Sequence, residues 1–199
     1  MSDQGPVESF GGTDEQLVVR CRRDRAALQG SFRALYERHA GRCLRFLQSL
    51  MGSEERAKDA LQETFLRVYH QLDRYDADRP FGPWLLGIAR HVAADALRRE
   101  ARRPASALPE VEPAAPDADG SPVPAEVSRR EEVGFVREAV GALPDREREV
   151  FLLKHVEGLT FDEVAGAVGC SVRTAKYRMR AAVDALAVDL RARGVLEGA

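Results

Sequence analysis

The sequence has few cysteines and no long apolar run. Its three cysteines, Cys21, Cys43 and Cys170, are widely spaced, and no C-x-x-C pair occurs. These features argue against a disulfide framework and a cysteine-type zinc site. The polar, slightly acidic residues 1–12 lack the basic and apolar regions of a signal peptide, and no stretch has the length and apolarity to span a membrane. We therefore expect a cytoplasmic protein.

Sequence signals of enzymatic chemistry are also missing. There is no glycine-rich phosphate loop, no nucleophile elbow and no plausible metal triad. His39 and Cys43 stand at i, i+4 on a predicted helix, where a half-buried His beside a core Cys is the simplest interpretation; His91 and Asp95 share this spacing without an apparent third ligand. We predict no catalytic residues, no metal and no cofactor. A metal-dependent enzyme would require the fold to bring His39, His91 and Asp95 together.

Charge is abundant but balanced. Charged residues make up 31% of the 199-residue chain and the net charge is only −2, so the chain as a whole is not a polyanion-binding protein. Residues 104–127 contain six prolines, five acidic residues and no basic residue, which buries too little apolar surface for folding. We interpret them as a flexible acidic linker. No run of alternating β-branched residues occurs, so the predicted fold class is all-α: two small helical domains, residues 13–103 and 128–196, joined by this linker.

Apolar residues in the first domain recur with helical period. Thr13 and Gln16 have capping-box spacing, and Gly52-Ser53 supplies a stop and a new N-cap. The predicted helices cover residues 27–50, 53–72 and 84–102, with a loop over residues 73–83. Each helix has a stripe of residues predicted to face the core. On the first helix these are Phe32, Leu35, Tyr36, Cys43, Leu47 and Leu50; on the second, Ala57, Leu61, Thr64, Phe65, Val68 and Leu72; on the third, Leu85, Ile88, Val92 and Ala96.

Two surfaces of this domain are candidates for binding. Leu66 lies among polar residues on a second face of the helix over residues 53–72, which indicates a partner surface rather than plain solvation. The loop and the last helix combine aromatic rings, on which melted bases can stack, with arginines that can hold phosphates; Trp84 as a core residue and the arginines as solvated groups are the alternative. The first surface consists of Asp59, Gln62, Glu63 and Leu66, and the second of Tyr75, Arg79, Phe81, Trp84, Arg90, His91, Asp95, Arg98, Arg99, Arg102 and Arg103.

The second domain carries the signals of a helix-turn-helix. Its caps and turn residues agree on two helices separated by a sharp turn. In order they are Pro144 and Asp145 in the first turn of one helix, Gly158 at its end, the capping box Thr160–Glu163, the left-handed C-cap Gly169 and the N-cap Ser171. The predicted buried residues are Val150, Leu153 and Val156 in the first helix, and Val172, Ala175, Met179, Ala182 and Leu186 in the last.

The exposed N-terminal side of this last helix is polar and basic, without an acid. A recognition helix needs this arrangement because its first turns enter the major groove, where Arg and Lys reach guanine edges or phosphates and Thr and Tyr reach phosphates or thymine methyl groups. We predict DNA binding; a structural hairpin with a basic surface is the alternative. The residues are Arg173, Thr174, Lys176, Tyr177, Arg178 and Arg180.

Three segments in order resemble the extracytoplasmic-function (ECF) group of the sigma-70 family. Residues 57–66, AKDALQETFL, are similar to its polymerase-binding segment. Residues 79–90, RPFGPWLLGIAR, resemble its melting and −10 recognition segment. Residues 143–180, with GLT, EVA and TAK at their family spacing, resemble its −35 recognition domain. The resemblance covers nearly everything from Thr13 to Leu190.

The resemblance implies a transcription initiation factor that binds core RNA polymerase and promoter DNA and is commonly held by an anti-sigma factor. The linker would pass through the polymerase cleft, where its acidic residues can imitate nucleic acid. His91 and Tyr177 stand where the family often has Asn and Ser, which changes the expected promoter preference. The implied polymerase contacts are Asp59, Gln62, Glu63, Phe65 and Leu66. The implied −10 contacts are Tyr75, Arg79, Phe81, Trp84, Arg90, His91, Arg98, Arg99 and Arg102. The implied −35 contacts are Arg173, Thr174, Lys176, Tyr177, Arg178 and Arg180.

Two other interpretations stay open. A LuxR-like regulator has a C-terminal segment similar to residues 143–180 and binds operators, but it would carry a receiver or ligand-binding domain in place of the first domain. A decoy or inhibitor would share the sigma factor shape and lack initiation activity.

Overall fold

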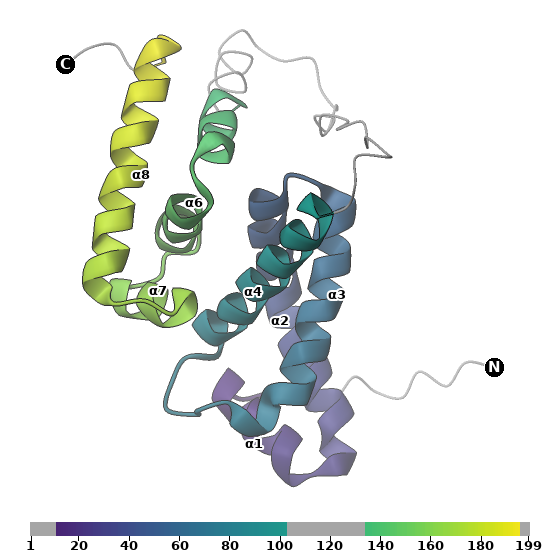
Figure 1. The fold of residues 1–199 in the computed structure, drawn as a ribbon. Coiled ribbons are helices and arrows are strands. Elements are labelled where there is room, and N and C mark those ends of the chain that lie inside the picture. The colour runs from purple at the N-terminus through teal and green to yellow at the C-terminus, as the bar shows by residue number, and fades with distance from the viewer. Residues whose placement is uncertain (1–10, 103–133, 196–199) are drawn as a thin grey trace, which may run out of the picture.

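The computed structural model describes residues 11–102 and 134–195, and every regular element in these ranges is helical (Figure 1). The predicted all-α class is therefore confirmed. The predicted acidic linker, residues 104–127, lies outside the described residues. In the described ranges, no helix combines the length and the apolarity needed to cross a membrane.

The first unit is built around three long helices. Figure 1 shows α2, α3 and α4 packed side by side, with α1 folded back against α2 at one end of the unit. A short 3-10 turn, η1, continues α3 and leads into the loop before α4. The bounds are α1 (Asp14–Arg23), α2 (Arg25–Met51), α3 (Glu54–Gln71), η1 (Leu72–Arg74) and α4 (Phe81–Ala101).

Local capping explains where these helices begin and end. Thr13 and Gln16 form the predicted capping box, in which each side chain accepts a hydrogen bond from the other's backbone N–H. Gly52 ends α2 in the left-handed conformation, with φ of 65°. Ser53 then accepts a hydrogen bond from the backbone N–H of Arg56 and starts α3.

The start of α4 differs from the prediction. The helix begins at Phe81, three residues before the predicted start, and therefore includes Pro83 in its first turn. Backbone N–H groups of a first turn have no acceptor within the helix, so a proline costs little there. Glu15 of α1 helps to fix the start, because its carboxylate accepts a hydrogen bond from the backbone N–H of Phe81 at 3.4 Å.

The core of the first unit confirms most of the predicted stripes. All six residues of the stripe predicted on α3 are buried. Phe46, which was not among the predicted core residues, is fully buried near the C-terminal end of α2. The prediction for Tyr36 is wrong, because 42% of this residue is exposed. Its ring lies against the edge of Phe65, with 4.7 Å between ring centroids, at the rim of the core.

The second unit is the predicted helix-turn-helix. Thr160 and Glu163 form the predicted capping box, Gly169 ends the short helix with φ of 72°, and Ser171 caps the last helix. Figure 1 shows α8 running alongside α6, with α7 crossing near one end of both. Residues 134–142 are helical, and the following elements are α6 (Asp145–Phe151), the π-helical turn η2 (Leu152–Val156), α7 (Phe161–Val168) and α8 (Val172–Ala192).

The π-helical turn η2 corrects one predicted core residue. Backbone hydrogen bonds run from Glu157 to Leu152 over five residues rather than four, which widens the turn and rotates the following side chains. Leu152 and Leu153 are buried as a result, whereas Val156, predicted to be buried, is 55% exposed. In a regular α-helix Val156 would lie on the same side as Leu152 and Leu153 and would be buried with them.

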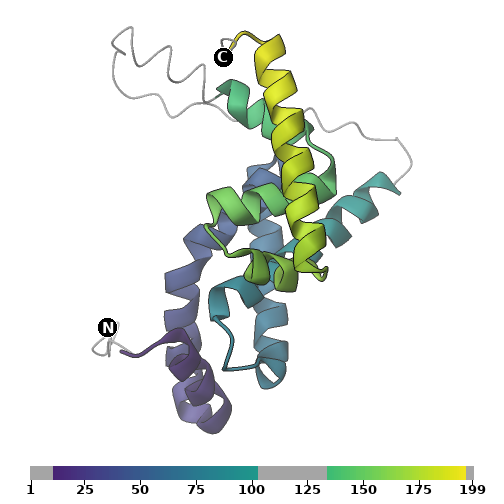
Figure 2. The ribbon, with the colours of Figure 1, turned by 90° about the vertical axis from the view of Figure 1, so that its left-hand side faces the viewer.

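The two units pack directly against each other. Helix α7 lies against α4, and Figure 2 shows the second unit covering one side of the first. The backbones approach closely at Gly87 of α4, where a side-chain Cβ would lie 3.3 Å from the backbone oxygen of Ala167. Glycine thus permits the two helices to touch backbone to backbone at this point. No sequence pattern indicated this packing.

Candidate nucleic-acid interface

Helix α8 presents the predicted recognition surface to solvent. Arg173, Lys176 and Arg180 are exposed, and Tyr177 is 73% exposed. The N-cap Ser171 holds the first turn by accepting a hydrogen bond from the backbone N–H of Thr174 at 3.1 Å. The cationic first turns are therefore capped at their N-terminus and open to a ligand.

Phe161 of α7 is a residue of this surface that the sequence did not single out. The ammonium groups of Lys154 and Lys176 lie 5.2 and 5.7 Å from the centre of its ring, within range of a cation–π attraction. Lys154 also donates a hydrogen bond to the backbone oxygen of Leu159 at 2.8 Å. Phe161 thereby attracts the ammonium group of Lys176, a residue of the recognition helix α8.

The loop before α4 differs from its predicted role in one respect. Tyr75 and Phe81 are only 3% and 1% exposed, so neither ring is open to a stacking base in this conformation. Their rings pack with half-buried Trp84, at centroid separations of 4.9 to 5.7 Å. The Tyr75 hydroxyl donates to the backbone oxygen of Arg79, and burial raises the pKa of this hydroxyl to about 12. These aromatics form the base of the loop and leave Arg79 exposed at its end.

Arg22 of α1 fixes the other side of this loop. Its guanidinium donates to the backbone oxygen of Leu72 at 2.7 Å and also to that of Tyr75. It lies 5.9 Å from the centre of the Tyr75 ring. The sequence offered no signal for this interaction, because a basic residue near a helix end does not indicate a partner far along the chain.

Arg90 and His91 lie where α4 meets the second unit. Arg90 forms an ion pair with Glu149 of α6 at 3.1 Å, and the two side chains are only 14% and 12% exposed. Arg90 also donates to Nε2 of His91 at 2.9 Å, while Nδ1 of His91 donates to the backbone oxygen of Gly87 at 2.7 Å. The Nε of Arg90 is buried without a hydrogen-bond partner. Arg90 is thus occupied by the second unit, whereas His91 remains exposed.

A second ion pair joins the units at the π-helical turn. Arg42 of α2 donates to the side chain and to the backbone oxygen of Glu157, whose carboxylate is only 4% exposed. Burial, with a smaller contribution from the charge of Glu157, raises the pKa of nearby Cys43 to about 12. Two charge pairs therefore join the units: Arg90–Glu149 is largely buried, whereas in Arg42–Glu157 only the glutamate is buried.

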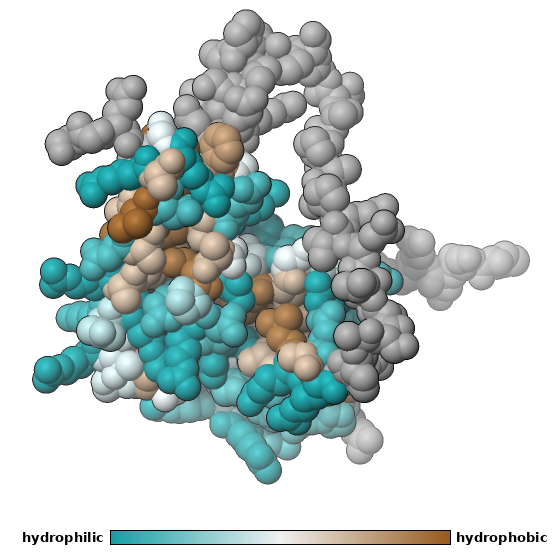
Figure 3. Space-filling view, turned by 45° about the horizontal axis from the view of Figure 1, so that its top comes forward, coloured by the Kyte–Doolittle hydropathy of each residue, from teal (hydrophilic) through white to brown (hydrophobic). Residues whose placement is uncertain are grey.

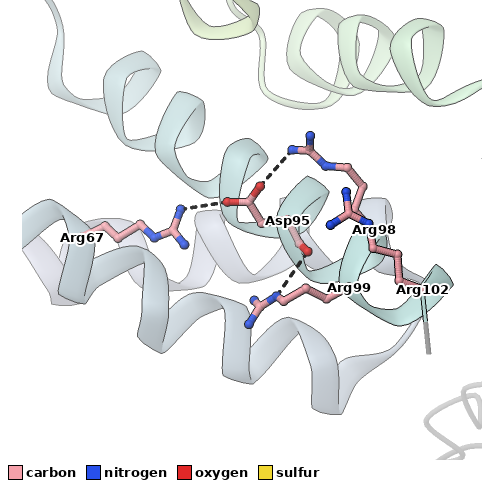
Figure 4. Close-up of a pocket in the computed structure, with 5 residues that line it drawn as sticks. All are labelled: Arg67, Asp95, Arg98, Arg99 and Arg102. Carbon is pink, nitrogen blue, oxygen red and sulfur yellow. Dashed lines mark hydrogen bonds and ion pairs between the residues drawn. The ribbon is translucent and has the colours of Figure 1, made fainter.

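The far end of α4 holds an arginine-lined cavity of 260 Å³ (Figure 4). Asp95 lies at its centre: one carboxylate oxygen accepts from Arg67 at 3.3 Å and the other from Arg98 at 2.9 Å. The backbone oxygen of Asp95 accepts from Arg99 at 3.3 Å, and Arg102 completes the lining. Arg67 comes from α3 and was not predicted as a site residue.

The predicted polymerase-binding face of α3 is largely exposed. Asp59 and Gln62 are exposed, and Leu66 is 53% exposed. Glu63 is half-buried and pairs with Arg67 at 2.7 Å. Phe65 is only 4% exposed, so it supports this face from the core rather than presenting its ring on the surface.

Further apolar side chains are exposed on the second unit. Figure 3 shows brown apolar surface among teal residues at the end formed by residues 134–142 and α8. The exposed large apolar residues of these segments are Phe135, Val136, Tyr177, Val183 and Val188.

The structure does not bring together the residues of the enzyme alternative. His39 contacts Asp14 at 2.6 Å and the ring of Phe81, while His91 is bound to Arg90 and Gly87 as described. Among the residues that the structure describes, no group of three or more His, Cys, Asp or Glu is arranged to hold a metal ion.

Comparison with known proteins adds independent findings. Models described as Sigma-70 region 2 and Sigma-70, region 4 match residues 35–103 and 136–186. The RNA polymerase sigma factor CarQ of Myxococcus xanthus is 35% identical over 156 residues, 78% of this chain and 87% of that protein. The ECF RNA polymerase sigma factor SigE of Mycolicibacterium smegmatis is 31% identical over 157 residues, 78% of this chain and 60% of that protein. The structure of CnrH in complex with the cytosolic domain of CnrY matches with a TM-score of 0.66 and 26% identity, covering 91% of this chain and 99% of that one.

Proposed function

The chain belongs to the ECF group of the sigma-70 family of RNA polymerase sigma factors, and we propose how its surfaces divide the work of initiation. As a sigma factor it is a transcription initiation factor rather than a catalytic enzyme. The LuxR-like alternative is not supported, because the first unit matches sigma-70 region 2. We propose that it acts in the cytoplasm, where core polymerase and promoter DNA are found together.

The proposed division follows the two units. Residues 13–103 bind core polymerase and the −10 element, residues 104–127 link the units, and residues 128–196 bind the −35 element. The observation that supports this division is that two matched regions fold into separate helical units, each with its own exposed face. Two modest affinities on one chain combine through effective concentration.

Core polymerase binding is assigned to α3. Asp59, Gln62 and Leu66 offer exposed polar and apolar groups along one face. Tyr69 is 45% exposed one turn beyond Leu66 and extends the apolar part of this face. An apolar centre surrounded by polar groups is the usual composition of a protein interface.

Promoter contacts are assigned to both units. Arg79, half-buried Trp84 and His91 are the groups of the first unit that remain available near the loop. The N-terminal turns of α8 carry the −35 contacts, and Tyr177 is the most exposed large side chain there. The described structure thus supports groove binding at α8. Base capture at the loop would rest on half-buried Trp84, because Tyr75 and Phe81 are buried.

Promoter binding requires the two units to separate. Arg90, a proposed −10 contact, is held by Glu149 in the packed arrangement. Its unpaired Nε leaves one buried donor unsatisfied, at a cost of about 1–3 kcal/mol. This unsatisfied donor destabilises the packed state. Core polymerase binding can therefore shift the equilibrium between packed and separated units toward the separated state.

We also propose an anti-sigma factor as a partner. CnrH, which is similar in sequence and fold, was solved in complex with the cytosolic domain of CnrY. The apolar surface on α8 and residues 134–142 gives such a partner a binding area on the second unit. A protein that bound this surface and also contacted the first unit would favour the packed state.

The test is reconstitution with purified core polymerase. The full chain should co-elute with bacterial core polymerase and should give promoter-selective transcripts from a genomic fragment library. Co-elution without transcripts would indicate a decoy. If the protein bound duplex DNA but not core polymerase, the proposed division of surfaces would be wrong.

A further inference from the structure

The first helix holds both ends of the loop that precedes α4. Helix α1 contacts η1 at the end of α3 (Figure 1). There the guanidinium of Arg22 donates to the backbone oxygens of Leu72 and Tyr75. At the other end of the loop, the carboxylate of Glu15 accepts a hydrogen bond from the backbone N–H of Phe81. One short helix thus bridges the two points where the loop leaves and re-enters helical structure.

The geometry of α1 places these two side chains for this role. Arg22 follows Glu15 by seven positions, which is close to two helical turns, so both side chains leave the same face of the helix. Leu17, Val18 and Cys21 bury the adjacent face of α1 in the core. The helix is therefore anchored, and the two contacts are about 10 Å apart along its axis.

Between these ends the loop is held by local bonds. The Tyr75 hydroxyl donates to the backbone oxygen of Arg79. The backbone N–H of Arg79 donates to the backbone oxygen of Asp76, and that of Asp78 to the carboxylate of Asp76, both at 3.1 Å. Residues 76–80 are exposed. Because these bonds join residues of the loop to one another, the position of the whole loop depends on where its ends are held.

The Arg22 contact is stronger than an ordinary bond at a loop end. Arg22 is half-buried, and its guanidinium lies 5.9 Å from the centre of the Tyr75 ring. Carbonyl oxygens at the C-terminal end of a helical turn carry partial negative charge, which favours a cation there. Loss of the guanidinium would leave these oxygens without their charged donor. The penalty would act on the loop conformation rather than on the helical core.

We propose that Arg22 and Glu15 are positioning residues for −10 recognition. By holding both ends of the loop, they set the conformation in which Arg79 and Trp84 meet the melted strand. The proposal rests on the proposed function and adds α1 to it, a helix that carries none of the predicted DNA contacts. Neither residue needs to touch DNA, because its charged group is already bound to the loop. A loop held in its binding conformation before DNA arrives loses less entropy on binding.

Amide hydrogen exchange of the free full chain tests the contact itself. R22Q and E15A should each raise the exchange rate of loop amides, that of Phe81 included, by about tenfold, because the loop opens more often. E15Q keeps an oxygen that can accept from Phe81 and should exchange like the wild type. R23Q is the matched control, since Arg23 carries the same charge on the same turn of α1 and is exposed. Unchanged exchange in both R22Q and E15A would overturn the proposal.

The second test measures sequence preference rather than affinity alone. The probe is a fluorescent single strand with the −10 element of a promoter recovered from the genomic fragment library, and a scrambled strand is the reference. Anisotropy with the full chain on core polymerase gives the ratio of the two affinities. R22Q and E15A should lower this ratio about fivefold to tenfold, whereas E15Q and R23Q should keep the wild-type ratio. A merely structural role would weaken binding to both strands alike and leave the ratio unchanged.

The outcomes separate this proposal from the proposed function. If R22Q and E15A loosened the loop but kept the wild-type ratio, α1 would not position the loop for recognition, and the proposed function would stand. If the wild type itself showed no preference for the −10 strand, the proposed function would fail together with this role of α1. Core affinity and thermal melting, measured for every variant, should match the wild type and show that the fold is intact.

Discussion

Replacing Glu149 by Gln should open the packed arrangement of the two units. Arg90 Nη1 contacts both oxygens of Glu149, at 3.1 and 3.3 Å, and both side chains are largely buried. A hydrogen bond to a charged group contributes about 1.5–3 kcal/mol. The amide oxygen of E149Q still accepts a bond, so we expect the low end of this range, which is a shift of about tenfold toward the separated state.

The shift can be measured in two ways. If the packed state dominates in the free protein, the affinity for core polymerase should rise by about the same tenfold factor, because a larger fraction is competent to bind. Small-angle X-ray scattering should show a larger radius of gyration for E149Q. Replacing Glu37 by Gln in the exposed Arg33–Glu37 pair is the control, since surface pairs contribute under about 1 kcal/mol.

Gly87→Ala provides a second route to the same state. The added methyl would lie 3.3 Å from the backbone oxygen of Ala167, so it disturbs the interface by steric crowding rather than by charge. Both variants should raise core affinity and the radius of gyration. If E149Q and G87A matched the control variant E37Q in both measurements while remaining folded, the packed arrangement would not limit polymerase binding and the reasoning would be refuted.

Three further predictions concern the separate surfaces and the core. R173A and K176A should each weaken promoter binding by about tenfold and lower the salt slope by about 0.9 for each phosphate that is no longer neutralised, with core affinity unchanged; a fall in core affinity in paired gel-shift and co-elution assays would contradict this. D59A combined with Q62A should do the reverse in the same assays. Burial raises the pKa of Cys43 from its usual value of 9.0 to about 12, so the unfolded chain loses this proton first and the free energy of unfolding should fall between pH 9 and 12. C43A should flatten that fall in urea melts, and equal slopes for both proteins would contradict the assignment.

Features that depend on neighbouring residues were predictable from the sequence. Thr13, Ser53, Thr160 and Gly169 cap or end their helices as predicted, because each interaction involves residues three or four positions apart. The helix-turn-helix followed from the same local signals. Helical periodicity likewise predicted the α3 stripe, since burial there follows directly from a regular helix.

Features that depend on irregular backbone or distant interactions were not predictable. Val156 is exposed because a π-helical turn precedes it, and no residue type at that position signals such a turn. Tyr75 and Phe81 were placed on a binding surface, but they lie in the core. The site also includes Arg22 and Arg67, whose partners come from other helices. Only the packed structure brings such pairs together.

The ion pairs around Arg67 form a continuous line between two surfaces. Glu63 on the proposed polymerase face holds Arg67, Arg67 holds Asp95, and Asp95 holds Arg98, a proposed −10 contact, in the arginine-lined cavity. If polymerase draws Glu63 into its own interactions, Arg67 shifts its hydrogen bonding toward Asp95 and alters how firmly Arg98 is held. Thermodynamic reciprocity then requires promoter DNA bound to Arg98 to change the affinity for polymerase by the same factor. A sigma factor with this line of charges would release polymerase more or less readily according to whether promoter DNA is bound.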